Sequence, residues 1–446
     1  MLKTFSIGGI HPAPNKLTDK KAIENAALPK QAVFPLSQHI GAPSVPCVQK
    51  GDLVKVGTVI AQPGGFMSAC IHSSVSGKVA KIDSVVDASG YRKPAIFIDV
   101  DGDEWEPSID RSDSLVTECG LSPQEIIDKI KEAGIVGLGG ACFPTHVKLA
   151  PPKDCKIDTL IINAVECEPY LTADHRLMLE HPDQILVGVK ILLKALAIDK
   201  AVIAIEENKP DAIALLEQKA ANMPGIEIQP LKMKYPQGGE KQLIEAVTGR
   251  QVPPPPALPA NVGCVVQNVG TVYAIYEAVI KNKPLIERIV TVTGDSVKNP
   301  CNLKVRMGTP VGQIIEQAGG MPEDTGKLLS GGPMMGRPLL GADAPVVKGT
   351  SGILMLPEKV AERREERNCI RCAKCVDACP MGLEPYKLAT ATQQQDWEKC
   401  EQEWILSCIE CGCCQSTCPS RRPLLDWIRL SKNKVNGIVR ARQAKK

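Results

Sequence analysis

Two cysteine runs near the C-terminal end constrain this chain more than any other feature. CIRCAKCVDACP at 369–380 and CIECGCCQSTCP at 408–419 share the spacing C-x2-C-x2-C-x3-C-P. Scattered core thiols would not repeat one spacing, disulfide frameworks are typical of short secreted chains, and zinc sites usually join two C-x2-C units across a longer spacer. Thiols at i, i+3 and i+6 surround one face of a cubane, so the spacing favours two [4Fe-4S] clusters.

The fourth cysteine of each run predicts how the clusters share ligands. In bacterial two-cluster ferredoxins, which have this spacing, the fourth cysteine binds the other cluster. We therefore predict two crossed ligand sets, Cys369, Cys372, Cys375 and Cys418 for one cluster and Cys408, Cys411, Cys414 and Cys379 for the other. We interpret Cys400 and Cys413 as packing residues.

Length and composition define the broad class. A chain of 446 residues with 43% apolar content is long enough for about two to four domains. A net charge of +3 and 3% aromatic residues provide neither the basic surface nor the stacking side chains of a nucleic-acid-binding protein. Eighteen cysteines indicate a reducing compartment, so we expect a cytoplasmic location. The most apolar stretches, 185–198 and 261–280, contain polar residues, and we expect a soluble chain.

Residues 1–100 are predicted to form a barrel-sandwich domain of the biotinyl/lipoyl type. The segments 51–65 and 73–85 are alternating apolar runs broken by glycine, and they resemble the two halves of such a barrel. The hairpin GGFMSACIHSS at 64–74 lacks the modified lysine of carrier domains. We therefore expect a structural or docking domain.

Strand–helix alternation at 115–285 predicts a Rossmann-like α/β domain. A helix capped by Ser122 is expected over 122–135. The segments 158–165 and 201–207 are typical of buried parallel strands, with a helix at 181–198 between them.

The remaining segments predict three further units. Residues 286–345 favour a small β-grasp domain with a helix starting near Thr309. The segment 359–430 is predicted to be a ferredoxin-type two-[4Fe-4S] domain, entered through a charged helix at 359–367. Residues 431–446 form a basic tail, which suits an anionic membrane or an acidic partner, or is simply a frayed end.

Four stretches of the α/β domain carry candidate ligand-binding residues. GLGGACFPTHVK at 137–148 has adjacent glycines where backbone can approach a flat ligand, but it lacks the third glycine of a Rossmann fingerprint and the G-K-[ST] of a P-loop. NAVECEPY at 163–170 follows a predicted strand, KYPQGGEKQ at 234–242 is a second glycine turn, and VVQNVGT at 265–271 offers neutral polar groups. Because α/β sheets bind ligands at the carboxyl ends of their strands, the four stretches together predict one pocket.

These stretches resemble the FMN and NADH site of the flavoprotein subunit of respiratory complex I, whose patterns run G-R-G-G-A-G-F-P-T-G-x-K, N-A-D-E-x-E-P-G, Y-x-x-G-E-E and V-x-N-N-V-x-T. The resemblance implies FMN, NAD(H) and the binding residues Gly137, Gly139, Gly140, Phe143, Lys148, Asn163, Glu166, Glu168, Tyr235, Gly238, Glu240, Asn268 and Thr271. It places Lys148 near the flavin phosphate or N1, stacks Phe143 on nicotinamide or adenine, and directs the glutamates to the carboxamide or ribose. We expect no catalytic proton base.

Four positions depart from those patterns. Leu138 replaces an arginine, Val165 an aspartate, Gly239 a glutamate and Gln267 an asparagine. Each change removes a polar contact to the nucleotides.

Nearly the whole chain is similar to the RnfC (RsxC) component of the Rnf complex, the membrane-bound ferredoxin:NAD oxidoreductase that pumps ions. GGIHP, SQHIGAP, GGACFPTHVKL, INAVECEPYLTADHRLM, YPQGGEKQ and both cysteine runs match that family. The resemblance implies a peripheral subunit on the cytoplasmic face of a bacterial membrane, passing electrons between two [4Fe-4S] clusters, FMN and NAD(H). Its partners would be the membrane subunits and the iron-sulfur protein of the Rnf complex (its B component), with ferredoxin acting indirectly.

Two alternatives have the same motifs in part. A cobalamin reductase of bacterial microcompartments shares the flavin core and clusters but lacks a barrel-sandwich domain ahead of the flavin domain. A non-enzymatic iron-sulfur relay scaffold would keep the clusters and bind no nucleotide. The A component of the Na+-pumping quinone reductase is a related scaffold, but it lacks cluster motifs.

Overall fold

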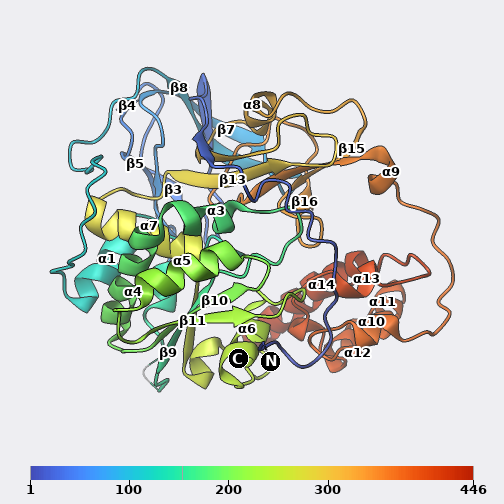
Figure 1. The fold of residues 1–446 in the computed structure, drawn as a ribbon. Coiled ribbons are helices and arrows are strands. Elements are labelled where there is room, and N and C mark those ends of the chain that lie inside the picture. Colours follow the sequence, from blue (N-terminus) through green and yellow to red (C-terminus); the bar gives the residue numbers. More distant parts are fainter. Residues whose placement is uncertain (1, 153, 445–446) are drawn as a thin grey trace.

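The computed structural model describes residues 2–152 and 154–444, which fold into β-rich, α/β and helical units packed against one another (Figure 1). The barrel-sandwich and β-grasp sheets lie above the α/β unit in this view, and the helical unit lies to its side. None of the described helices has the length and apolar character that a bilayer crossing requires.

Residues 31–100 form two antiparallel sheets with a shared core. One sheet has the order β2 (Gln31–Pro35), β8 (Arg92–Val100), β7 (Gly77–Val86), β4 (Leu53–Val54), and the other has the order β3 (Val45–Pro46), β5 (Val59–Gln62), β6 (Ile71–His72). Val79 and Ile98 from the first sheet and Ile60 and Ile71 from the second are fully buried. This arrangement confirms the predicted barrel sandwich.

One strand before β2 lies outside these two sheets. β1 (Ile23–Asn25) pairs in parallel with β14 (Cys301–Arg306) of the β-grasp sheet. The preceding residues run along the α/β unit instead. Alternating apolar runs identify strands but not the sheet that an edge strand joins, so the pattern could not locate β1.

A four-stranded parallel sheet forms the centre of the α/β unit. Its order is β11 (Ile226–Leu231), β10 (Ala201–Glu206), β9 (Thr159–Asn163), β12 (Cys264–Asn268). One face packs on helices α1 (Pro123–Glu132), α3 (Ala173–Glu180), α4 (Pro182–Leu196), α5 (Pro210–Ala220) and α7 (Val269–Lys281), and the other face packs on α6 (Glu240–Thr248). Short helices α2 (Thr145–Lys148) and η1 (Pro259–Val262) lie in connections.

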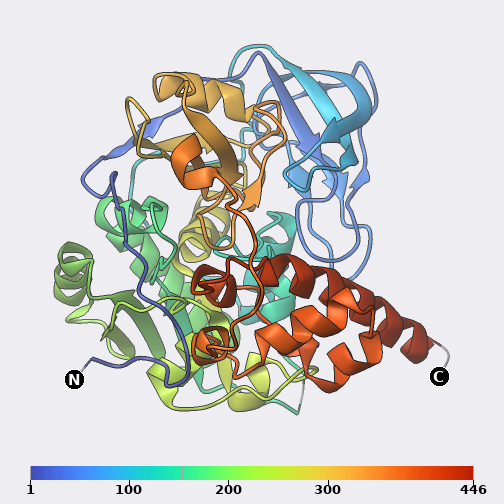
Figure 2. The same ribbon diagram turned by 90° about the vertical axis from the view of Figure 1, so that its right-hand side faces the viewer.

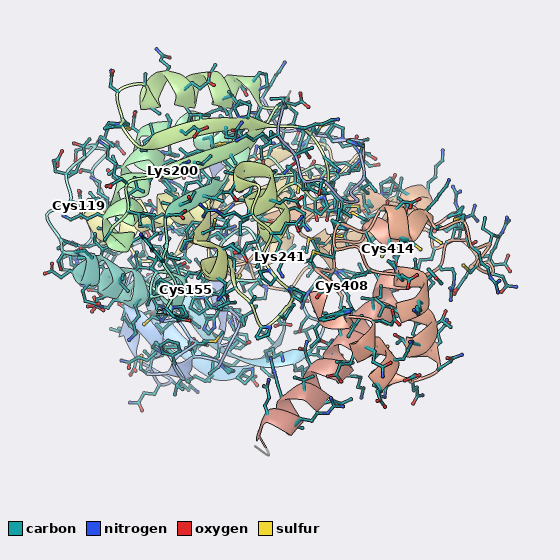
Figure 3. The ribbon with its side chains drawn as sticks, turned by 90° about the horizontal axis from the view of Figure 1, so that it is seen from below. Cys119, Cys155, Lys200, Lys241, Cys408 and Cys414 are labelled. Carbon is teal, nitrogen blue, oxygen red and sulfur yellow. The ribbon has the colours of Figure 1, made fainter. Side chains whose placement is uncertain are left out.

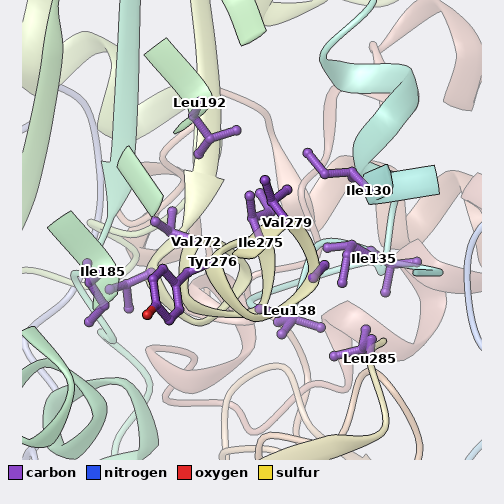
Figure 4. Close-up of a cluster of buried hydrophobic side chains, with 14 of the residues drawn as sticks. Ile130, Ile135, Leu138, Ile185, Leu192, Val272, Ile275, Tyr276, Val279 and Leu285 are labelled. Carbon is purple, nitrogen blue, oxygen red and sulfur yellow. The ribbon is translucent and has the colours of Figure 1, made fainter. Parts of the chain in front are cut away.

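Alternate side chains of the central strands account for this layering. Leu160 and Ile162 of β9 join the core beneath α4 and α7, whereas Ile161 joins the core beneath α6. Figure 4 shows the first of these cores around α7. Ser122 caps α1 in a capping box with Glu125, as expected. The predicted strands and helices of this unit are therefore confirmed within a few residues.

The β-grasp unit has a six-stranded mixed sheet. Its order is β1, β14, β13 (Glu287–Thr293), β17 (Gly352–Pro357), β15 (Thr325–Ser330), β16 (Arg337–Pro338), and α8 (Val311–Gln317) packs on it. The predicted helix start near Thr309 is confirmed. The predicted end at 345 is too early, because β17 lies inside the sheet.

The cysteine-rich unit is helical. It contains α10 (Lys374–Asp377), α11 (Pro385–Gln393), α12 (Trp397–Gln402), η2 (Ile405–Ser407), α13 (Cys413–Ser416) and α14 (Leu424–Ala444). Leu424, Ile428, Ser431 and Val435 fall on one buried face of α14. Because this periodicity continues through residue 431, the predicted separate basic tail belongs instead to α14, up to residue 444. Residues 445–446 lie outside the described residues.

The charged helix predicted at 359–367 is wrong. α9 (Glu358–Ala361) is a single turn, and the described residues 362–373 form neither helix nor strand. This segment is exposed throughout and has no apolar face to pack, so helix propensity alone does not hold it in a helix.

Candidate redox site

The carboxyl ends of β9 and β12 lie side by side and carry residues of the predicted ligand site. Asn163 and Asn268 are register partners at the ends of these neighbouring parallel strands. The Asn163 amide donates to the carbonyl of Gly238 at 2.8 Å. Asn268 caps α7 by accepting the N–H of Gly270 at 2.9 Å and that of Thr271 at 3.3 Å. The strand ends therefore bring residues from three predicted stretches together.

Gly139 and Gly140 present bare backbone at this edge. A Cβ at Gly139 would lie 2.7 Å from Nδ2 of Asn268, whereas a Cβ at Gly140 would have no described atom within 4 Å. The loop is held in place where the Leu138 N–H donates to Thr271 Oγ1 at 2.9 Å. The peptide at Gly140 is thus accessible to a flat ligand, while Gly139 must remain small to admit Asn268.

The other half of the glycine loop leads into α2 and its lysine. Gly137 donates its N–H to the carbonyl of Phe143, which is half-buried, at 2.9 Å. Lys148 Nζ lies 2.6 Å from Glu240 Oε1 and donates to the carbonyl of Val266 at 3.1 Å. Both charged side chains of the pair are partly exposed.

Glu166 is engaged at a helix terminus. Its carboxylate accepts the N–H groups of Asp174 at 2.8 Å and His175 at 3.1 Å, at the start of α3. A carboxylate at this end of a helix is stabilised by the helix dipole. This contact supports a structural role for Glu166.

Glu168 and Tyr235 connect the α/β unit to its neighbours. Glu168 Oε2 and Oε1 accept the N–H groups of Met334 at 3.1 Å and Met335 at 2.8 Å in the β-grasp unit. Although part of the residue reaches the surface, burial of its carboxyl group raises the pKa to about 7. The buried Tyr235 hydroxyl lies 3.4 Å from Glu168 Oε1 and donates to the carbonyl of Cys411 at 2.8 Å.

Two further charged residues near these strand ends, the partly buried Asp174 and the buried Arg288, were not predicted. Asp174 Oδ2 accepts from the Asn268 amide at 2.7 Å, and burial followed by the nearby Glu166 carboxylate raises the pKa of Asp174 to about 7. Arg288 of β13 donates to the Leu138 carbonyl at 3.1 Å, and burial lowers its pKa. Asp174 lies within a segment matched to the Rnf family, which was its only sequence signal.

The four departures are accommodated without charges. Leu138 and Val165 are buried, and Gly239 is the residue before α6. Gln267 is also buried, and its Nε2 has no partner among the described groups. An unpaired buried donor therefore lies close to the end of β12.

Four cysteines drawn from both runs line one cavity. Cys379, Cys408, Cys411 and Cys414 surround it together with apolar residues that include Leu383, Leu388, Leu425 and Ile428. Backbone N–H groups also reach sulfur, since Leu383 donates to Cys379 Sγ and Glu410 donates to Cys408 Sγ, both at 3.4 Å. The structure thus brings together one complete predicted ligand set, and Figure 3 shows Cys408 and Cys414 on the side facing the α/β unit.

The second predicted set lies at the surface. Cys369 and Cys372 are exposed, and Cys375 and Cys418 are partly exposed. Both runs turn in the same way, because left-handed residues occupy matching positions at Arg371 and Ala373 in one run and Glu410 and Gly412 in the other. Cys400 and Cys413 are fully buried, consistent with packing.

The buried set supplies four thiols. Among the described residues, no three Cys, His, Asp or Glu side chains converge as they would around one metal ion. The ligands of a cubane bind different irons and stand farther apart, and thiolates are the usual ligands of iron–sulfur clusters.

Comparisons with protein families place these units in a known class. The RnfC barrel-sandwich hybrid domain matches residues 3–103, the Nuo51 FMN-binding domain matches residues 130–277, and the SLBB domain matches residues 289–338. The chain is thus a multidomain protein of the class built around a complex I-type FMN-binding domain.

Curated relatives identify the family within that class. The C component of the Na(+)-translocating ferredoxin:NAD(+) oxidoreductase complex of Acetobacterium woodii is 45% identical, over 96% of both chains. The C component of the proton-translocating complex of Clostridium ljungdahlii is 46% identical, over 100% of this chain and 97% of the relative. The chain belongs to this family, the RnfC proteins of the ion-translocating ferredoxin:NAD(+) oxidoreductase (Rnf) complexes.

A solved structure is also partly similar. An NAD+-reducing [NiFe]-hydrogenase in its H2-reduced state matches with a TM-score of 0.49 and 20% identity, covering 70% of this chain and 62% of that one.

Proposed function

We propose that this chain is the NAD(H)-reactive electron-transfer subunit of a membrane-bound, ion-translocating ferredoxin:NAD+ oxidoreductase, and that it binds FMN and two [4Fe-4S] clusters. The observation that carries the proposal is the direct contact between the buried cysteine set and the flavin domain, where Tyr235 donates to the carbonyl of Cys411 at 2.8 Å. Family membership over nearly the whole length supports it.

The pocket at the ends of β9 and β12 fits FMN in its donors and its open backbone. Gly140 provides accessible peptide for the ring, Lys148 provides a cation for the phosphate or N1, and Asn163 and Asn268 provide amides. Phe143, half-buried on the same loop, is proposed to stack on the nicotinamide or adenine. Bound FMN would supply the conversion between the two-electron chemistry of NADH and the one-electron chemistry of a cluster.

We assign the remaining predicted residues by their contacts. Gly137, Gly139, Gly238 and Thr271 shape the pocket, and Glu240 holds Lys148. Glu166, Glu168 and Tyr235 are proposed to position neighbouring elements rather than to bind nicotinamide, because their polar groups bond α3, the β-grasp unit and the cysteine run.

The two cysteine sets are proposed to act in series. The buried set lies against the flavin domain and is surrounded by apolar side chains. The exposed set, with Cys369 and Cys372 at the surface, is accessible to a partner. In the complex that partner would be the iron-sulfur B component, with ferredoxin acting indirectly, and the chain would lie on the cytoplasmic face of the bacterial membrane against the membrane subunits.

A relay that binds no nucleotide is the second candidate, and one observation favours it. Lys148 already pairs with Glu240, and Asn268 already donates to Asp174. FMN would have to compete with these internal contacts.

An anaerobic titration tests the proposal. Iron and sulfide are reconstituted, FMN is added, free flavin is removed by gel filtration, and NADH is titrated while the flavin and cluster absorbances are recorded. Bleaching of both chromophores is expected. Loss of flavin on the column, or retained flavin that stays oxidised with excess NADH, would instead establish the relay.

A further inference from the structure

The N-terminal segment, residues 2–18, is a strap along the α/β unit. Figure 2 shows this dark blue segment passing between the green α/β unit and the red helical unit. The carbonyl of Lys3 accepts the N–H of Lys232 at 3.0 Å, and Thr4 Oγ1 donates to Gln237 Oε1 at 2.7 Å. The far end is held by Lys16, whose Nζ donates to carbonyls of the loop 166–171 at 2.6–2.9 Å.

The middle of the strap contacts the helical unit directly. Gly9 donates its N–H to the carbonyl of Ala378 at 3.0 Å. Gly8 has a φ of +67° and packs so closely that a Cβ there would overlap the backbone of Cys379 and Pro380. Only glycine satisfies both the left-handed backbone and this approach.

The same part of the strap forms backbone hydrogen bonds with Tyr235. Ile10 and Tyr235 form an antiparallel bridge, with N–H to carbonyl distances of 2.8 and 2.9 Å in the two directions. The Tyr235 hydroxyl continues to the carbonyl of Cys411. The strap therefore touches Cys379 itself and reaches Cys411 through one side chain, and both cysteines line the buried cavity.

We propose that the strap, through Gly8 and the Ile10–Tyr235 bridge, positions the buried cysteine set on the flavin domain and thereby sets the separation across which electrons pass. Gly8 is thus a positioning residue. The inference rests on the proposed function, and it adds a role for the segment ahead of the barrel. Because the rate of electron tunnelling falls steeply with distance, a small displacement of Cys379 would slow electron transfer.

Gly8→Ala in the full, anaerobically reconstituted chain tests the strap. NADH should bleach flavin at the wild-type rate, whereas the transfer of single electrons onward to the clusters should slow by about tenfold or more, by analogy with the cost of small misplacements between reacting groups. The EPR spectrum of the dithionite-reduced protein should change for one cluster and not for the other. Gly51→Ala is the matched control, because Gly51 also has a positive φ but a Cβ there would meet no described atom within 4 Å.

The outcomes separate the strap from the proposed function. If Gly8→Ala has the EPR spectrum and the rate of cluster reduction of the wild type, the strap does not position the buried cysteine set. A wild-type chain that binds clusters but no flavin would contradict the proposed function. The EPR comparison would still decide whether the strap positions the buried cysteine set. If Gly8→Ala does not fold, Tyr235→Phe removes the hydroxyl that donates to Cys411 and lies near Glu168, and the proposal predicts a smaller change in the same cluster signal.

Discussion

At the residue scale, Gly140 offers the sharpest test of the pocket. A Cβ there meets no described atom within 4 Å, so Gly140→Ala should leave the melting temperature unchanged. If a flavin ring approaches this peptide, the methyl group should weaken FMN binding by about tenfold, or roughly 1.4 kcal/mol. Fluorescence titration of FMN measures this. Gly120→Ala is the control, because a Cβ at Gly120 also meets no described atom within 4 Å. Equal FMN affinity in the wild type and both variants would show that Gly140 is not part of the site.

Glu168 gives a pH dependence at the same scale. Its folded-state pKa of about 7 lies above the ordinary 4.5, so the folded chain binds more protons than the unfolded chain between these values. Stability is therefore lost as the pH rises through that window. The melting temperature of Glu168→Gln relative to wild type should rise from about pH 5 to about pH 8, corresponding to at most about 3 kcal/mol.

The control for that measurement is Glu227→Gln, at an exposed glutamate of β11. Its melting temperature should follow wild type at every pH. A Glu168→Gln difference that stays constant with pH would mean that the carboxyl group is ionised throughout.

At the element scale, the two cysteine runs predict crossed ligation that substitutions can separate. Cys379→Ala and Cys408→Ala should remove the same cluster although they lie in different runs, and Cys369→Ala should remove the other. Iron content should fall from about eight to about four per chain in each case. The EPR signal that remains should match between the first two variants and differ in the third.

The opposite grouping would show that each run binds its own cluster. In that case the EPR signals that remain in Cys379→Ala and Cys369→Ala would match each other. Cys413→Ser should retain both clusters, because Cys413 is buried against Tyr235 outside the ligand spacing.

The sequence predicted an element correctly where the pattern that defines the element is local. The cysteine spacing is local, and the structure gathers four of the predicted ligands in one cavity. The helix and strand periods of the α/β unit are local too, and they were correct. The positions of the strap, of β1 and of Asp174 depend on partners distant in sequence, so no local pattern contained them. The helix predicted at 359–367 did not form for another reason, because its helix-favouring charged side chains have no apolar surface to pack on.

At the scale of the whole molecule, Lys348 joins three units. Its Nζ donates to the carbonyl of Cys70 in the barrel sandwich at 2.6 Å and to that of Gly134 after α1 at 2.7 Å. Burial lowers its pKa to about 8. Lys348→Met leaves both carbonyls without this donor, and we expect a loss of about 1–3 kcal/mol after relief of the buried charge.

Calorimetric unfolding checks that value. Lys78→Met, at an exposed lysine of β7, is the control and should unfold like wild type. An unchanged melting temperature in Lys348→Met would mean that the units hold together without this contact.

The strap also orders the events of folding. Gly8 and Cys379 come from opposite ends of the sequence, yet they are in contact. The α/β unit can complete its sheet from local strand and helix pairs. The strap cannot make its contacts until the cysteine-rich unit has been synthesised and has folded. Closure of the strap is therefore expected to be a late, non-local step, which follows a stage in which the FMN-binding domain is complete while its contact with the cysteine-rich unit is still open.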